Sequence, residues 1–390
     1  MKVGMPHILA AVLIVSGLSL ARSTSIYAPA PAASTPTIPA KAEAAQGLTR
    51  IALGSCADQH LREPIWDAVI AARPELFIFM GDNVYGDVSG KDPALPELAK
   101  AYRDFGQIAG FKSLREEVPI LAIWDDHDYG VNDGNRTFAL KAQSKALFMS
   151  FWNVPLDSPR AKHPGLYDSV IIGPEGERVQ IILLDLRWFR DPFKPTDQRG
   201  APGKEVYLSD PDPIRTMLGA AQWAWLEGEL RKPAELRLIV SSIQVLADGH
   251  GFEKWGNFPV ERRRLFDVIA KTSANGVVLV SGDRHVGALY RQAEGVPYPL
   301  FEMTSSSLNK PATNITDEPG DNRLGGLADQ ANFGLVLIDW TRRTVRLELH
   351  DVDGRVIEPV ASVPIAALHV PEVVTAPTIG TVVPGGCFTS

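Results

Sequence analysis

The chain has 390 residues, of which 45% are apolar and 22% charged, so it is long enough to bury a large hydrophobic core. Its 39 Lys and Arg residues and 46 Asp and Glu residues give a net charge of −7 at pH 7. This balance argues against a nucleic-acid-binding surface, because the densest basic cluster, residues 262–264, lies beside apolar residues in a pattern typical of a solvated helix face.

The amino-terminal segment has the pattern of a secretory signal. Lys2 precedes an apolar stretch at residues 8–20, which small residues follow and which is too short for a comfortable membrane span. We therefore expect a secreted or periplasmic protein that keeps no stable membrane span after cleavage, with an uncleaved anchor as the alternative. The expected division of the chain is a signal peptide at 1–25, an Ala/Pro-rich linker at 26–46, one domain at 47–370 and a flexible tail at 371–390.

Apolar runs of strand length alternate with segments of helical periodicity. The predicted strands are residues 50–54, 76–80, 119–124, 180–184, 236–240 and 277–282, followed by 335–339 and 345–350. The predicted helices are residues 62–72, 95–109, 137–152, 215–230 and 260–272. This alternation predicts an α/β layered fold.

Polar side chains follow each of the first six predicted strands. The run 76–80 is apolar throughout, as in a strand covered on both faces, and it ends at Gly81 and Asp82. One such ending would be explained by a turn or a helix cap. Six of them predict a single crevice, because the carboxyl ends of strands in an α/β sheet converge outside the sheet. The groups gathered in this way include Cys56, Asp82, Asp126, His127, Arg187, Gln244, Asp283 and His285.

The residue types at these strand ends favour metal ions. Carboxylates with a phenol and an imidazole suit oxygen-preferring metals and ferric iron, whereas a zinc site more often contains several closely spaced Cys or His residues. The donors outnumber the needs of one ion, and the two oxygens of Asp82 are able to bridge two ions. Paired ions supply hydroxide and hold phosphate oxygens during in-line displacement at phosphorus.

Four short motifs carry a resemblance to a known family. They are Gly54-Ser55-Cys56, Gly81-Asp82-Asn83-Val84-Tyr85, Trp124-Asp125-Asp126-His127-Asp128 and Ser281-Gly282-Asp283-Arg284-His285. In their order and spacing, from about residue 49 to about residue 350, the chain resembles the alkaline phosphatase D (PhoD-like) branch of the metallophosphoesterases. The resemblance implies a four-layer αββα sandwich with the metal site at the carboxyl ends of the strands.

The resemblance implies a first metal ion, expected to be ferric iron. Asp82 would bridge this ion to a second one, and Cys56, Tyr85 and His285 would complete its protein ligands. The alternative for Tyr85 is simple packing in its loop. The alternative for Cys56 is a disulfide bond with Cys387.

The second ion is expected at Asp126 and Asp283. Asp126 stands where the superfamily has an Asn and Asp283 where it has a His, and both replacements favour calcium. Zinc, manganese and magnesium are the alternatives for the two ions. The chain departs from the superfamily in two places: a segment with Cys56 replaces the usual first Asp- and His-bearing motif, and the fifth-strand motif has no His, so that Gln244 or His250 would have to serve.

The resemblance also implies catalytic residues. His127 would protonate the leaving oxygen or hold a phosphate oxygen, rather than being a purely structural histidine, and Asp125 and Asp128 are expected to orient their neighbours. Arg187 would bind the phosphoryl group as a fork of donors, unless it pairs with Asp185 or Asp191 instead. The residues predicted to contact substrate in the cleft are Gln244, His250 and Glu253.

These features predict a secreted dinuclear-metal phosphoesterase that hydrolyses small phosphate monoesters by attack of metal-bound hydroxide, an alkaline phosphatase activity. The alternative on the same fold is a phosphodiesterase or phospholipase-D-like activity. A Ser-His-Asp acyl hydrolase would need a Gly-x-Ser-x-Gly elbow, and the sequence contains none. A metal-binding module without catalysis is disfavoured, because competent residues fill the expected catalytic positions apart from the two departures.

Overall fold

The computed structural model describes residues 1, 46–313, 315, 318 and 320–371. Apart from single residues at their ends, the predicted signal peptide, linker and tail lie outside the described residues, so the division of the chain stays a prediction. Cys387 lies outside them as well, and Cys56 is a buried free thiol within them. In the part of the chain that is described, no helix is long and apolar enough to cross a lipid bilayer.

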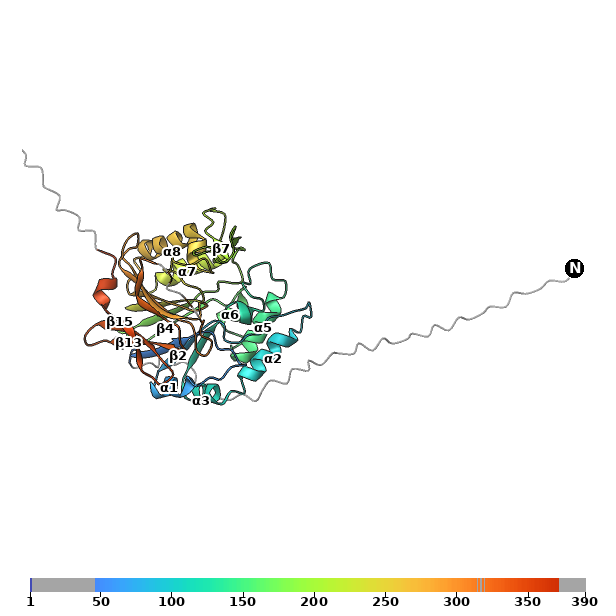
Figure 1. Cartoon of the computed structure of the whole chain (residues 1–390), viewed down its shortest axis with the longest axis horizontal. Coiled ribbons are helices and arrows are strands. Elements are labelled where there is room, and N and C mark those ends of the chain that lie inside the picture. The colour runs from blue at the N-terminus through green and yellow to red at the C-terminus, as the bar shows by residue number, and fades with distance from the viewer. Residues whose placement is uncertain (2–45, 314, 316–317, 319, 372–390) are drawn as a thin grey trace, which may run out of the picture. The chain divides into compact units, whose positions relative to one another are not determined.

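The first large sheet combines three strands from the amino-terminal part of the fold with three strands near its carboxyl-terminal end (Figure 1). Its order is β15-β14-β13-β1-β2-β3, with β1 to β3 parallel and β13 antiparallel to β1. The five positions of β2 are all buried, which explains why its sequence is an unbroken apolar run. The strands are β1 Arg50–Gly54, β2 Leu76–Met80, β3 Ile120–Ile123, β13 Phe333–Asp339, β14 Thr344–His350 and β15 Val356–Pro364.

The second large sheet has the order β12-β10-β11-β9-β8-β5-β4. Strands β5, β8, β9 and β11 are parallel to their neighbours in this series, and β5, β8 and β9 are buried at every position. The strands are β4 Asp168–Ile172, β5 Val179–Leu183, β8 Leu236–Ser241, β9 Val277–Ser281, β10 Gly287–Gln292, β11 Leu300–Ser305 and β12 Arg323–Ala328. A separate short hairpin is formed by β6 Lys194–Pro195 and β7 Tyr207–Leu208.

Helices cover the outer faces of the two sheets. The helices are α1 Trp66–Ala71, α2 Pro96–Phe105, α3 Ala109–Glu117, α4 Asp126–Tyr129, α5 Lys141–Phe151, α6 Pro159–Lys162, α7 Gly219–Leu230 and α8 Pro259–Lys271, with 3₁₀ turns η1 Trp255–Asn257 and η2 Ile365–Leu368. On the first sheet, the ring of Trp66 in α1 lies 5.9 Å from that of Phe79 in β2. On the second, the side-chain amide of Gln180 in β5 donates to the carbonyl of Glu229 in α7.

The two sheets pack face to face between these helix layers. A Cβ atom added at Gly334 in β13 would lie 2.7 Å from Leu53 of its own sheet and 2.9 Å from Met303 of the other. In Figure 1, α7 and α8 lie on one side of the sheets, and α1 and α3 lie on the other. The expected four-layer αββα sandwich is therefore confirmed.

The sheets join where β1 and β11 end. Ser55 and Ser306 form a parallel bridge, and the backbone N–H of Leu308 donates to the carbonyl of Ser55 at 2.9 Å. Three of the predicted strands that end in polar groups belong to the first sheet and three to the second. This junction brings strand ends from both sheets together. The sequence predicted one crevice at these strand ends, but it did not distinguish two sheets.

The predicted elements are present. The helix expected at 95–109 is α2, which ends at Phe105 with Gly106 as its C-cap. The strands predicted at 50–54 and 76–80 have the bounds of β1 and β2, and the other predicted elements are found with shifted ends. Strands β4, β6, β7, β10, β11, β12 and β15 and helices α3, α4 and α6 were not predicted.

The aromatic layer between α1, α3 and β2 generates a stability prediction. Phe79 is fully buried, and its ring lies 5.0 Å from that of Trp152 and 5.9 Å from that of Phe111. We expect Phe79→Ala to lower the free energy of unfolding by about 3–5 kcal/mol, because it removes apolar contacts and leaves a cavity. Urea denaturation followed by circular dichroism measures the change. Leu156→Ala, at a side chain that is 88% exposed, is the control and should change it by less than about 0.5 kcal/mol.

Candidate metal centre and its cavity

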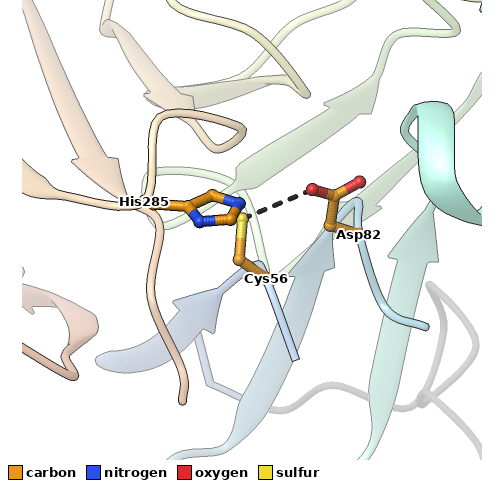
Figure 2. A group of neighbouring side chains, drawn as sticks. All are labelled: Cys56, Asp82 and His285. Atoms are coloured by element: carbon orange, nitrogen blue, oxygen red, sulfur yellow. Dashed lines mark hydrogen bonds between the residues drawn. The ribbon is translucent and has the colours of Figure 1, made fainter. Parts of the chain in front are cut away.

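The first group of donor atoms comes from the ends of β1, β2 and β9. The thiol of Cys56, a carboxylate oxygen of Asp82 and a ring nitrogen of His285 all lie within 4.8 Å of one another (Figure 2). The Tyr85 hydroxyl donates to Asp82 Oδ2 at 3.1 Å and lies 3.0 Å from His285 Nε2. The structure thus brings together all four residues predicted for the first ion.

These strand ends share an unusual backbone conformation. Cys56, Asp82, Asp283 and His285 have φ angles of 60°, 50°, 70° and 57°, in the left-handed region that side chains disfavour. Such residues cost on the order of 1–3 kcal/mol each and cluster at functional sites. Gly81, with φ 107°, precedes one of them, and a Cβ atom there would lie 2.5 Å from the Cβ of Asp125. The chain therefore turns sharply at each strand end and directs these side chains inward.

A second group of donors adjoins the first. Donor atoms of Asp82, Asp126 and His127 lie within 4.8 Å of one another, and so do those of Asp125, Asp126 and Asp283. Asp126 is the first residue of α4, which follows β3, and Asp283 follows β9. Asp82 belongs to both groups, which is the arrangement that a bridging carboxylate requires.

Burial and the repulsion between neighbouring charges shift the pKa values of these groups. Burial, and then the neighbouring Asp126 and Cys56, raise the pKa of Asp82 well above its usual value. Burial raises the pKa of the Cys56 thiol to about 11, and it lowers the pKa of His285 to about 4, which keeps the imidazole neutral. For Asp126, burial is outweighed by the Arg187 guanidinium and other neighbours, and its pKa is lowered. The protein alone leaves several carboxylates close together with little compensating charge.

The donors fit metal ions. Asp82 Oδ1 is buried and has no hydrogen-bond partner among the described residues. A carboxylate oxygen in this condition is costly unless it is paired, and cations are its natural partners. Thiolate, phenolate, imidazole and carboxylate in the first group suit ferric iron, whereas the carboxylates of the second group suit a hard divalent ion.

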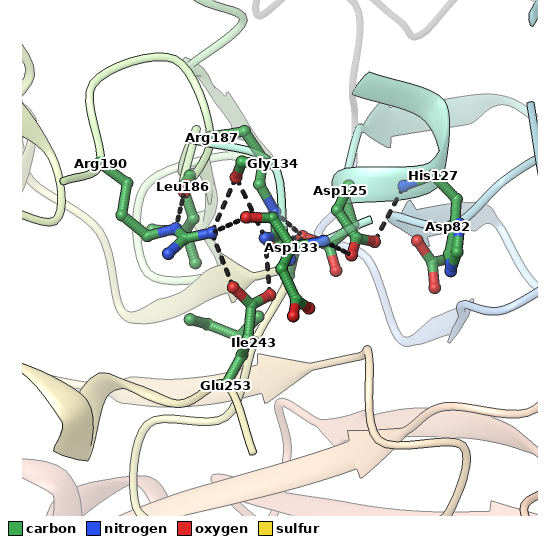
Figure 3. A network of polar contacts seen from close by, with 12 residues as sticks. Asp82, Asp125, His127, Asp133, Gly134, Leu186, Arg187, Arg190, Ile243 and Glu253 are labelled. Carbon is green, nitrogen blue, oxygen red and sulfur yellow. Dashed lines mark hydrogen bonds and ion pairs between the residues drawn. The ribbon is translucent and has the colours of Figure 1, made fainter. Parts of the chain in front are cut away.

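Arg187 lies behind the candidate metal site and holds two carboxylates there (Figure 3). Its side chain is fully buried; Nη2 lies 2.6 Å from Asp125 Oδ1, and Nη1 lies 2.6 Å from Glu253 Oε2. Its partners are therefore not Asp185 or Asp191; Asp185 instead accepts from the Arg187 backbone N–H at 2.9 Å. Arg187 is not among the residues that line the cavity. Direct phosphate binding by this side chain stays a prediction, and its contacts support a positioning role.

Asp125 and Asp128 are held in place by other side chains, as expected of orienting residues. Asp125 accepts from Ser242 Oγ at 2.5 Å in addition to Arg187. Asp128 accepts from the Asp125 N–H at 2.6 Å and from Asn83 Nδ2 at 2.5 Å. These bonds fix the start of α4, and with it the positions of the two residues between them.

His127 has a partner that sequence reasoning missed. Its Nδ1 lies 2.6 Å from Asp87 Oδ2, and its ring centroid lies 4.3 Å from that of Tyr85. Although burial acts to lower the pKa of His127, the carboxylates of Asp87 and Asp126 raise it. Asp87 follows the Gly81–Tyr85 motif closely, and the only signal in the sequence was a second carboxylate after the strand end.

A cavity of about 760 Å³ opens beside both donor groups. Its lining includes Asp82, Asp126, His127, Asp283 and His285 from the site, together with Asp133, Glu205, Tyr207, Phe252, Glu253, Arg284 and Glu318. Asp133 connects the second donor group to the cavity lining. Its N–H donates to Asp126 Oδ2 at 2.6 Å, and its carboxylate accepts from the Tyr207 hydroxyl at 2.5 Å. Sequence reasoning did not single out Asp133.

The three predicted substrate contacts lie in different environments. Glu253 lines the cavity. Gln244 and His250 do not; both are buried, with His250 Nε2 2.8 Å from Gln244 Oε1, and the Gln244 amide donates to Tyr290 and Thr304. The structure therefore supports a substrate-facing position for Glu253 alone.

The two facing sheets, with buried donors for two ions where their strands end, define an α/β sandwich with a candidate dinuclear metal centre. The chain belongs to the PhoD-like phosphatase family, whose model matches residues 51–349. Alkaline phosphatase D of Bacillus subtilis (strain 168) is 23% identical over 237 residues, which are 56% of this chain. The match spans 40% of that relative's length.

Solved structures share the fold. A structure of PhoD superposes with a TM-score of 0.61 at 16% identity, covering 82% of this chain and 69% of that one. GAP50, described as the anchor in the inner membrane complex of Plasmodium, superposes with a TM-score of 0.52 at 12% identity, covering 84% of this chain and 90% of that one. At these identities the two structures establish the architecture and not the activity.

The position of Asp82 in both donor groups generates a prediction about metal content. We expect Asp82→Asn to lose both ions, because it removes the shared carboxylate charge. Elemental analysis of protein prepared without chelators measures the metal per chain, and thermal unfolding should show a lower Tm for the variant. Asp197→Asn, at an exposed carboxylate that does not line the cavity, is the control and should keep both ions. Full metal content in Asp82→Asn would contradict the shared role.

Proposed function

We propose that the protein hydrolyses phosphate esters with two metal ions. The observation that carries this proposal is the pair of donor groups that share Asp82 and open, beside His127, into one cavity. The family of the chain supports it, because that family is described as phosphatases. Metal ions bound here would lower the pKa of a water molecule and neutralise the charge of the phosphoryl oxygens.

The residues around the ions have separable tasks in this proposal. His127 holds a proton for the leaving oxygen: the Asp87 side chain accepts from Nδ1–H, which leaves Nε2 for the substrate side. Arg187 holds Asp125 and Glu253 in place from behind the site. The side chains that line the cavity orient the rest of the ester.

We propose ferric iron for the first donor group and calcium for the second, in a secreted protein. The thiol of Cys56 and the phenol of Tyr85 favour the former, and the carboxylates of Asp126 and Asp283 favour the latter. Elemental analysis should find iron near one atom per chain, with calcium alongside. Zinc as the only metal would contradict this assignment.

The type of ester is the second part of the proposal. Monoester hydrolysis is the expectation from the resemblance to alkaline phosphatase D, and the motifs themselves do not distinguish the two ester types. A cavity of about 760 Å³ is large for a terminal phosphate alone and falls in the range of sites for drug-sized ligands. This volume favours diester hydrolysis as a second candidate, because it leaves room for another ester arm.

A comparison of two chromogenic esters tests the two candidates. Purified metal-loaded protein should release p-nitrophenol from p-nitrophenyl phosphate if monoesters are preferred. A kcat/KM for bis(p-nitrophenyl) phosphate well above that for the monoester would establish diesters as the preferred class. No turnover of either ester, with both metals present, would contradict the hydrolytic function and favour a binding role.

The contact between His127 and Asp87 generates a further prediction. We expect His127→Ala to lower kcat by about 10²–10⁴, because a proton donor is lost at the leaving oxygen. Asp87→Asn should lower kcat less than His127→Ala does, since the imidazole remains but its orienting carboxylate does not. Initial rates measure both, with Asp197→Asn as the control. Retention of both metals in His127→Ala, checked by elemental analysis, separates the loss of catalysis from a loss of the site.

A further inference from the structure

Arg284 occupies a part of the cavity to which neither the motifs nor the proposed mechanism assigns a task. It stands between Asp283 and His285 in the chain, and its side chain extends to the wall where Phe252 and Glu318 lie. The guanidinium carbon is 4.3 Å from the centroid of the Phe252 ring, and Nη2 forms an ion pair with Glu318. These contacts fix a nearly buried cation in the cavity wall.

The guanidinium of Arg284 is incompletely paired. Arg284 is only 8% exposed, and its Nε is buried without a hydrogen-bond partner among the described residues. Arginine remains charged and offers five N–H donors in a fixed fork. Because a buried donor without an acceptor is unfavourable, an acceptor from a bound molecule would stabilise this position.

Carboxylates lie on the same wall. Glu205 lines the cavity and accepts from the backbone N–H groups of Gly203, at 2.9 Å, and Gly251. Although burial acts to raise it, these N–H groups and the Arg284 guanidinium lower the pKa of Glu205. The adjacent Lys204 does not line the cavity and pairs with Asp197 at 3.0 Å.

The Arg284 wall, defined as Glu205, Phe252, Arg284 and Glu318, therefore combines two acceptors, one cation and a half-buried aromatic face. Among the described residues that line the cavity, Arg284 is the only Arg or Lys. A second anionic group on the substrate would be repelled by the carboxylates of Glu205 and Glu318, although Arg284 would attract it. A hydroxyl group is both a donor and an acceptor, so it is able to match the carboxylates and the guanidinium together.

We propose that the Arg284 wall binds the alcohol part of the ester and selects an uncharged alcohol that carries hydroxyl groups. This inference rests on the proposed phosphoester hydrolysis and adds the class of substrate. Arg284 is then a specificity residue that contacts the substrate away from phosphorus. Arg187, in contrast, holds other protein side chains.

Three esters of similar size test the selection without any change in the wall. They are glycerol 3-phosphate, n-propyl phosphate, which lacks the hydroxyl groups, and 3-phosphoglycerate, in which a carboxylate replaces the terminal hydroxymethyl group. Isothermal titration calorimetry with metal-loaded His127→Ala protein measures their affinities while turnover is slow. We expect glycerol 3-phosphate to bind about tenfold more tightly than either of the others, because a site built to pair with hydroxyl groups rejects analogues that lack them. Equal affinities would overturn the proposal.

A pair of arginine variants assigns the effect to the wall. In the same His127→Ala background, Arg284→Met should abolish the advantage of glycerol 3-phosphate over n-propyl phosphate. Arg264→Met is the matched control: this guanidinium also stacks on an aromatic ring, 4.4 Å from the centroid of Trp223, and pairs with Glu261 at 3.3 Å, but it lies outside the cavity lining. Equal weakening of both esters by Arg284→Met would mean that Arg284 is merely structural and would contradict the proposal.

The proposed phosphoester hydrolysis and the proposed role of the Arg284 wall are tested by independent experiments. Hydrolysis of p-nitrophenyl esters by the unsubstituted protein tests the proposed function and does not depend on the Arg284 wall. The order of affinities for the three alcohol esters tests the wall and does not depend on turnover. Hydrolysis without the expected order would overturn only the inference about the alcohol.

Discussion

The burial of several carboxylates in one small volume is the constraint on which the rest of the site depends. Asp82, Asp126 and Asp283 approach one another where water cannot solvate them fully, so each ionised group raises the cost of the next. Arg187 offsets part of this charge, but it is already shared between Asp125 and Glu253. The remaining negative charge makes the site a candidate for bound cations, and the supporting residues are extensively hydrogen-bonded.

The strands that are buried at every position could be predicted from the sequence. Strands such as β2 and β5 are covered on both faces, so their apolar runs are unmistakable. Strands β4 and β12 are only partly buried and mix polar with apolar residues, so hydrophobic periodicity does not identify them. The helix predicted at 95–109 ends earlier, at Phe105, because Gly106 follows it, a signal that periodicity alone did not weigh.

The site residues that directly follow strands could be predicted from the sequence. The residues that loops bring to the cavity could not. Tyr85 and His285 were placed together by their motifs, and the structure brings them within 3.0 Å. Asp133 and Arg284 reach the cavity because of the paths of their loops, which no local pattern encodes. The type of residue at Arg187 was informative, but its partners Asp125 and Glu253 are distant in sequence, so the sequence offered only the substrate, Asp185 or Asp191 as partners.

The junction of the two sheets has a consequence for how the protein matures. Ser55 and Ser306 join strands that are distant in the sequence, and the first donor group likewise combines Cys56 with His285. If an ion binds there as proposed, it would act as a cross-link that closes the chain between these two residues into a loop, and its binding energy would contribute to folding. A nascent chain that has not yet reached the end of β9 would lack one of the proposed ligands, His285. Uptake of the proposed first ion would therefore follow the synthesis of most of the fold.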